Sequence, residues 1–243
     1  MLLPRPKKLK IAIILSGMQK LPERSLKSIQ EIEKKYNVCV FCHCWENDPK
    51  INDYCFGSRN YPFPENKAEI FLKKYKNISY EVSDNNFYKN YFDNLWQQVK
   101  NKNGAKNSSF FSQFFSMSKA NKLKIEHEKN NTKFDIVIKM RFDLLIKKYI
   151  KFEEYDLSKI NIPYDDSYAF EKPEKGKPRG VNDQFAFGPP DLMNCYFNVF
   201  DSIVDICNKG SAFCPHAILG QYLLDNKVPV LRPTNIIYNI HNS

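Results

Sequence analysis

At 243 residues the chain is long enough to bury a core, and its 42% hydrophobic and 14% aromatic residues exclude a disordered protein. Every apolar stretch falls short of the roughly 18 residues that a membrane-spanning helix needs. The formal net charge of +10 is dispersed and carried mainly by lysine, which outnumbers arginine about fivefold, so it indicates a solvated surface more than a nucleic-acid interface.

Strand and helix patterns alternate along the first half of the chain. The basic start and the apolar run at 11–15 resemble a secretory signal, but the run is short and passes into a polar turn, so it predicts a core strand over 10–15 in a cytoplasmic protein. The later patterns predict a helix over 22–35, a strand over 38–44, a loop-rich crossing over 46–64, a helix over 64–74 and a strand over 78–82. Residues 83–109, polar and rich in asparagine, are expected to form a mobile loop.

The predicted strand over 38–44 carries three of the seven cysteines. Alternation turns Cys39 and His43 to one face and Cys42 and Cys44 to the other. A Cys-x-x-Cys pair would suit a redox or zinc element, but no second pair follows at zinc spacing. The pattern therefore favours reduced core thiols of a cytosolic protein.

The second half of the chain continues the alternation. Its patterns predict a long amphipathic helix over 109–130, a central strand over 134–140, a continuation of the sheet over 144–152, a long loop over 163–182, a strand over 183–188, helices over 189–207 and 215–226, and a last strand over 228–231. Alternating strands and helices, with no internal repeat and no clear linker, predict one α/β domain.

Three charged side chains mark the end of the central strand. Lys139, Arg141 and Asp143 alternate with apolar residues, so all three fall on one face. Such a face indicates a site for a charged ligand, and the alternative is an ordinary solvated edge strand. Arginine is rare in this chain, so Arg141 and Arg179 are candidates to bind a phosphate or a carboxylate through two parallel N–H bonds.

Four short blocks extend the pattern beyond this strand. They are Ser-Gly-Met-Gln-Lys at 16–20, Phe-Cys-His-Cys-Trp at 41–45, a Ser-Gln-Phe helix start at 112–114 that leads to the charged strand at 134–143, and Asp-Gln-Phe-Ala-Phe-Gly at 183–188. In this order they resemble the motifs of GT-A type glycosyltransferases from bacterial capsule and lipopolysaccharide clusters and from large viruses. Two departures lie in the charged strand: Lys139 stands in place of an arginine, and the usual Asp-x-Asp is Arg141-x-Asp143.

The resemblance implies a GT-A fold, which is a three-layer α/β/α sandwich with a mixed central sheet. It implies a single domain over 1–243, with a nucleotide-sugar-binding half over about 1–143 and an acceptor-binding half over about 144–243. The expected enzyme is a hexosyltransferase or a related transferase of surface polysaccharide or glycoprotein glycan synthesis. Its donor would be a nucleotide-diphosphate sugar, with UDP favoured, and its acceptor a glycan or a lipid-linked glycan. The basic surface also suits peripheral contact with the anionic inner face of a membrane.

The resemblance assigns the donor to the matched motif positions, which are Ser16, Gly17, Lys20, His43, Trp45, Gln113, Lys139, Arg141 and Asp143. Physical reasons agree: glycine admits a nucleotide close to the backbone, an indole stacks on a base, and cations neutralise a diphosphate. Three alternatives remain open, namely a plain turn at Gly17, a core aromatic at Trp45 and a surface glutamine at Gln113.

Asp183 is the expected catalytic base for the acceptor hydroxyl, because it follows a loop and opens a short strand. The alternative is an aspartate that caps the turn after Gly180. Asp165 and Asp166 are second candidates, and adjacent acids in such a loop are usually only solvated.

Asp143 is the candidate ligand for a Mn²⁺ or Mg²⁺ ion that would bridge the two phosphates. Only one carboxylate is present in the motif, so either His216 or His241 completes the coordination, or Arg141 replaces the ion. An ordinary helix-start residue is the alternative for His216.

Two other classes of function remain open. A nucleotide-sugar or polyanion-binding module would bind the donor without transferring the sugar. A basic nucleic-acid-binding protein would show an affinity that falls steeply with salt, although the chain has no nucleic-acid-binding motif and nucleic acid is not the expected partner.

Overall fold

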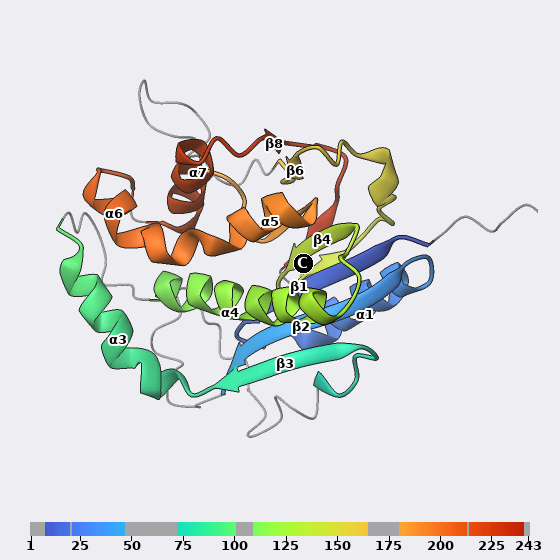
Figure 1. Ribbon diagram of the computed structural model, residues 1–243, viewed down its shortest axis with the longest axis horizontal. Helices are drawn as coiled ribbons and strands as arrows, with labels where there is room; N and C mark the ends of the chain where they lie inside the picture. The colour runs from blue at the N-terminus through green and yellow to red at the C-terminus, as the bar shows by residue number, and fades with distance from the viewer. Residues whose placement is uncertain are drawn as a thin grey trace, which may run out of the picture.

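Strand β1 (Lys10–Gly17) runs through the middle of the central sheet, and its aliphatic residues are buried on both faces. It pairs in parallel with β2 (Asn37–Trp45) and β4 (Ile136–Met140), and β2 pairs in parallel with β3 (Ile78–Ser83). A strand that is buried on both faces has a continuous run of apolar residues in the sequence. The predicted strands over 10–15, 38–44, 78–82 and 134–140 are confirmed. The structure, a computed structural model, describes residues 8–19, 21–46, 72–100, 109–164, 180–212 and 214–240 (Figure 1).

Three short strands continue the sheet beyond β4 and make it mixed. β7 (Phe185–Gly188) is antiparallel to β4, β6 (Ile160–Asn161) is antiparallel to β7, and β8 (Val230–Leu231) is parallel to β6. The resulting order is β3-β2-β1-β4-β7-β6-β8. The predicted α/β class with a mixed central sheet is confirmed, as are strands near 183–188 and 228–231.

Helices cover both faces of this sheet and make three layers (Figure 1). Ala12 and Ile14 of β1 belong to the core under α4 (Ser109–Asn130), whereas the alternate residues of β1 belong to the core under α1 (Pro22–Glu33). Both helices agree with the sequence prediction. The same alternation places Cys39 with the first core and Cys42 and Cys44 with the second, as expected.

Three helices of the C-terminal half pack on the same face as α4, and they are α5 (Pro190–Phe197), α6 (Ile203–Asn208) and α7 (Pro215–Asp225). The prediction for 215–226 is confirmed, but the single helix predicted over 189–207 is interrupted. A 3₁₀ segment (Asn198–Ser202) separates α5 from α6. Asparagine, aspartate and serine, three of the five residues of this segment, have low helix propensity, which agrees with the break.

The mobile loop predicted over 83–109 is wrong where the structure describes it, because it contains helix α3 (Asn85–Gln98). Phe92 and Trp96 lie one turn apart on its buried side, and Phe92 packs edge-on against Trp45 and Phe115. Asn90 and Asn94, two of the asparagines that suggested a loop, are exposed. Tertiary packing of the aromatic stripe therefore outweighs the low helix propensity of asparagine.

The predicted continuation of the sheet over 144–152 is also wrong. Only β5 (Leu145–Ile146) forms there, and it pairs with β9 (Tyr238–Asn239) in a separate two-stranded sheet. A 3₁₀ turn (Phe152–Glu154) follows, and Phe152 is buried in the core on the α1 side. The apolar residues of this stretch therefore cover a face of the central sheet instead of adding a strand to it.

The helix predicted over 64–74 and the loops predicted over 46–64 and 163–182 lie largely outside the described residues. Within the described ranges, no helix combines the length and the apolar character needed to cross a membrane.

Candidate functional site

Ser116 of α4 bonds to the carboxyl ends of β1 and β2, and His43 connects the same serine to the end of β3. The hydroxyl of Ser116 accepts a hydrogen bond from the backbone N–H of Gly17 at 2.8 Å and donates one to the carbonyl of His43 at 2.9 Å. The Nδ1 atom of His43 lies 2.8 Å from the same hydroxyl, and Nε2 lies 3.0 Å from the hydroxyl of Ser83. These contacts fix the edge of the sheet at which the motif residues meet.

His43 is held as a neutral, buried ring. Because the Ser116 proton goes to a carbonyl, the Ser116 oxygen must accept from Nδ1–H, and Nε2 then accepts from Ser83. Burial lowers the pKa of His43 to about 4. Trp45 is only 3% exposed and stacks on Phe115. Both rings were predicted to contact the nucleotide-sugar donor, but neither exposes a ring face that could do so.

Lys139 is buried at the end of β4, where β7 runs antiparallel to it. The pairing of Met140 with Phe185 brings the residues just before β7 beside this strand end. The ammonium of Lys139 donates to the carbonyls of Asp183 and Gln184, the latter at 3.1 Å. Burial lowers the pKa of Lys139 to about 8, and the Asp183 carboxylate opposes that change. Lys139 therefore places a positive charge beneath the site.

Arg141 and Asp143 form a two-pronged ion pair just beyond β4. Nε of Arg141 donates to Oδ1 of Asp143 at 2.8 Å, and Nη2 donates to Oδ2 at 2.7 Å. The arginine side chain is 35% exposed, whereas that of the aspartate is 9% exposed. β4 ends at Met140, so Arg141 and Asp143 lie in the turn after it and not on the strand face that alternation predicted; Arg141 is the more exposed of the two.

Asp183 joins the C-terminal half to this edge of the sheet. Its Oδ2 accepts a hydrogen bond from Nε2 of Gln113 in the first part of α4, and its Oδ1 lies 3.2 Å from Nδ1 of His216 in α7. Burial acts to raise the pKa of Asp183, but the nearby His216, Lys139 and Gln113 outweigh burial and lower the pKa below its usual value. Asp183 therefore remains a carboxylate in a buried setting.

Two tyrosines near Asp183 were not anticipated as part of a site. Tyr238 accepts a hydrogen bond from Asn182 and donates one to Oε1 of Gln184 at 3.3 Å. Tyr196 is fully buried, and its hydroxyl has no hydrogen-bond partner within the part of the chain that the structure describes. Burial raises the pKa of Tyr196, with a further contribution from Asp183. The sequence placed Tyr196 only within the helix predicted over 189–207.

The remaining predicted site residues either lie at the end of β1 or fall outside the described residues. Ser16 and Gly17 end β1 and are half-buried, and Gly17 has φ +99°, a conformation that favours glycine. The other candidates lie outside the described residues, and they are Lys20, Asp165, Asp166, Arg179 and His241.

The described residues do not fit the expected Mn²⁺ or Mg²⁺ ion. Both oxygens of Asp143 accept hydrogen bonds from Arg141, so an ion there would lie directly beside a guanidinium charge. Among these residues, no three side chains of His, Cys, Asp or Glu come together as a ligand set. His216 contacts Asp183 and not Asp143 through its Nδ1 atom. The metal requirement stays a prediction.

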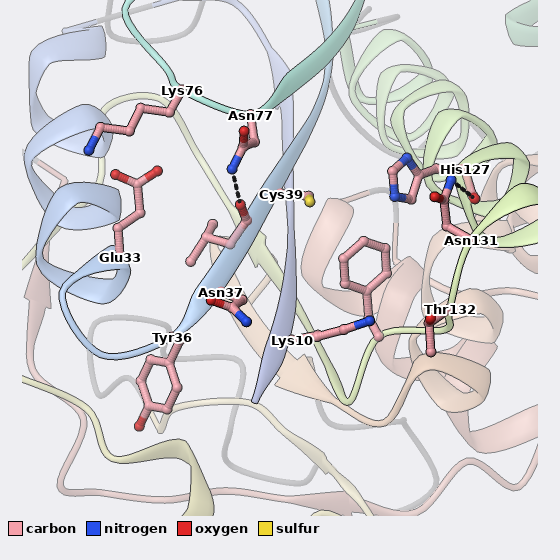
Figure 2. A pocket seen from close by; sticks show the side chains of 12 residues that line it. Lys10, Glu33, Tyr36, Asn37, Cys39, Lys76, Asn77, His127, Asn131 and Thr132 are labelled. Carbon is pink, nitrogen blue, oxygen red and sulfur yellow. Dashed lines mark hydrogen bonds between the residues drawn. The ribbon is translucent and has the colours of Figure 1, made fainter. Parts of the chain in front are cut away.

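A cavity of about 400 Å³ lies at the opposite edge of the sheet (Figure 2). Lys10 and Asn37, at the starts of β1 and β2, line it together with His127 and Asn131 from the last part of α4 and its end. Ligands of open α/β sheets bind beyond the carboxyl ends of the strands, so the polar cluster around Asp183 is the better candidate site.

No protein-family model matches this sequence, and no curated protein matches it either.

Proposed function

We propose that this protein is a GT-A type glycosyltransferase that moves a sugar from a nucleotide-diphosphate donor to a hydroxyl of a glycan or lipid-linked acceptor. The observation that carries the proposal is the meeting of Lys139, Arg141 and Asp183 at the carboxyl ends of the parallel strands. Ligands bind beyond this edge in open α/β sheets. Glycosyl transfer needs cations for the diphosphate, which Lys139 and Arg141 supply, and a proton acceptor for the hydroxyl, for which the polar groups around Asp183 are the candidates.

We assign the binding of the diphosphate to Arg141, because its guanidinium is more exposed than the ammonium of Lys139. Phosphate oxygens accept the same paired N–H bonds that Asp143 accepts in the absence of ligand. Asp143 thus holds the guanidinium in orientation until the donor arrives. Lys139 acts through its charge from beneath, since its ammonium is already bound to two backbone carbonyls.

The other motif residues receive different roles. Ser16 and Gly17 border the position of the nucleotide, for which the uridine series is favoured. Gln113 holds the Asp183 carboxylate. His43 and Trp45 maintain the strand ends and the aromatic core beside them, and they are not assigned donor contacts. The acceptor would approach from the side of the C-terminal helices.

Ligand binding provides the first test. The melting temperature would be measured with UDP, GDP, CDP and their sugars, each with and without Mn²⁺. A ligand at 100 times its dissociation constant adds about 2.7 kcal/mol to the free energy of unfolding if it binds only the folded state. We expect one nucleotide series to raise the melting temperature, Arg141→Gln to lose the shift and Lys129→Gln, which removes an exposed cation at the far end of α4, to keep it.

Turnover provides the second test, measured as release of the nucleoside diphosphate in the presence of a panel of glycan acceptors. Asp143→Ala should stay folded and lose turnover, and full activity of this variant would contradict the role of Asp143.

A nucleotide-induced rise in melting temperature without release of the diphosphate would favour a binding module. No nucleotide shift together with salt-sensitive binding of RNA or DNA would favour a nucleic-acid-binding protein. A shift that requires Mn²⁺ would mean that Asp143 exchanges Arg141 for the ion.

A further inference from the structure

The carboxylate of Asp183 is poorly arranged to take a proton from a substrate. Gln113 donates to one of its oxygens, and Nδ1 of His216 faces the other at 3.2 Å. The side chain of Asp183 is 6% exposed, whereas that of His216 is 15% exposed. The imidazole is thus somewhat more exposed than the carboxylate that it faces.

The surroundings of His216 specify which ring nitrogen carries the proton. Nδ1 faces two acceptors, Oδ1 of Asp183 at 3.2 Å and the carbonyl of Val181 at 3.1 Å. A nitrogen between two acceptors carries a proton, so whenever the ring is neutral its basic lone pair lies on Nε2. A carboxylate behind Nδ1–H also stabilises the imidazolium that forms when Nε2 takes up a proton.

The same segments clamp the imidazole in position. The backbone N–H of Val181 donates to the carbonyl of His216 at 3.1 Å, so the chain before β7 and the start of α7 are bonded in both directions. A Cβ atom at Gly180 would lie 3.3 Å from Cβ of His216, which makes glycine the residue that permits this approach. Arg232 donates to the carbonyl of Gly180 at 3.3 Å.

We propose that His216 is the general base of the reaction and that Asp183 is its positioning residue; this inference rests on the proposed function. Nε2 of His216 takes the proton of the acceptor hydroxyl as the hydroxyl oxygen bonds to the anomeric carbon of the donor sugar. The bond from that carbon to the diphosphate oxygen breaks, and its electron pair leaves with the nucleoside diphosphate. The imidazolium then returns its proton to solvent. Lys139 and Arg141 also act on the charge of Asp183, and Cys214 lies two residues before His216 in the chain.

The first experiment tests the arrangement without any substrate. The full-length chain, labelled with ¹⁵N-histidine, would be examined by two-bond ¹⁵N–¹H correlation at about pH 8.5, where an ordinary histidine is neutral. His216→Asn would identify the signals of His216 among those of the four histidines. We expect the Nδ1–H tautomer in the wild type and a shift toward the Nε2–H tautomer in Asp183→Asn. An Nε2–H ring in the wild type, or no change in Asp183→Asn, would overturn the assignment.

The second experiment separates a base from a structural residue. His216→Asn retains an N–H that can face Asp183 but has no basic nitrogen, and we expect kcat to fall by about 10²–10⁴-fold with little change in KM for the donor. His216→Ala should be equally slow and partly restored by added imidazole. His127→Gln, at the opposite edge of the sheet, serves as the matched control and should keep its turnover.

Each failure has a distinct signature. Full turnover by a folded His216→Asn, in a chain whose wild type transfers sugar, overturns the base role and leaves the proposed function intact. A wild-type chain that binds no nucleotide diphosphate and transfers no sugar overturns the proposed function and the base role with it. The tautomer measurement still decides whether Asp183 orients the imidazole.

Discussion

Acidification should unfold this protein partly through one buried histidine. His43 is fully buried between Ser83 and Ser116, and its pKa falls from the ordinary 6.5 to about 4. As the pH decreases, the unfolded chain takes up this proton before the folded chain does. The contribution of His43 to stability is therefore complete above pH 6.5 and is lost as the pH falls toward 4. The linkage amounts to roughly 3 kcal/mol when protonation is complete and to about 2 kcal/mol at pH 5.

The assay is urea unfolding at pH 7.5 and at pH 5, followed by tryptophan fluorescence. Trp45 is a suitable reporter because its ring centroid lies 4.9 Å from that of His43. The wild type should lose about 2 kcal/mol more than His43→Gln between the two pH values, and His127→Gln should behave like the wild type. Because the comparison is between two pH values, the cost of the substitution itself cancels. Equal losses in the wild type and in His43→Gln would refute the buried, neutral ring.

Two further predictions concern buried charges. The pKa of Lys139 is lowered from 10.5 to about 8, so the folded state releases this proton first as the pH rises. The wild type should therefore gain roughly 1 kcal/mol of stability relative to Lys139→Met between pH 7 and pH 9. The same pH dependence in urea unfolding of both proteins would contradict this. Lys124 is fully buried, and its ammonium pairs with Glu128 and donates to Asn194, each at 2.8 Å. Glu128→Gln should cost about 3–5 kcal/mol by leaving this buried charge without a counter-ion, while Lys124→Met combined with Glu128→Met should cost less. Equal destabilisation of the single and double variants, measured by urea unfolding, would show that the ion pair is unimportant.

Local sequence patterns predicted most of the described elements. Buried parallel strands read as apolar runs, and helices with one apolar stripe repeat every three or four residues, so β1, β2, β4 and α4 follow from the order of residues along the chain. The pattern failed where composition and packing disagree. The asparagines of α3 suggested a loop, but Phe92 and Trp96 bury enough apolar surface against the aromatic core to stabilise a helix.

The order of residues also brings Lys139, Arg141 and Asp143 to the end of β4, because the strand ends at Met140 and the last two residues follow it in a turn. Their partners depend on the tertiary fold. The antiparallel pairing of β7 with β4 brings Asp183 beside Lys139, and the packing of α7 brings His216 onto Asp183. Contacts between segments this far apart in the chain depend on strand order and helix packing, which no local pattern encodes. For that reason, the sequence suggested separate roles, a base for Asp183 and a metal ligand for His216, whereas in the structure the two side chains contact each other at 3.2 Å.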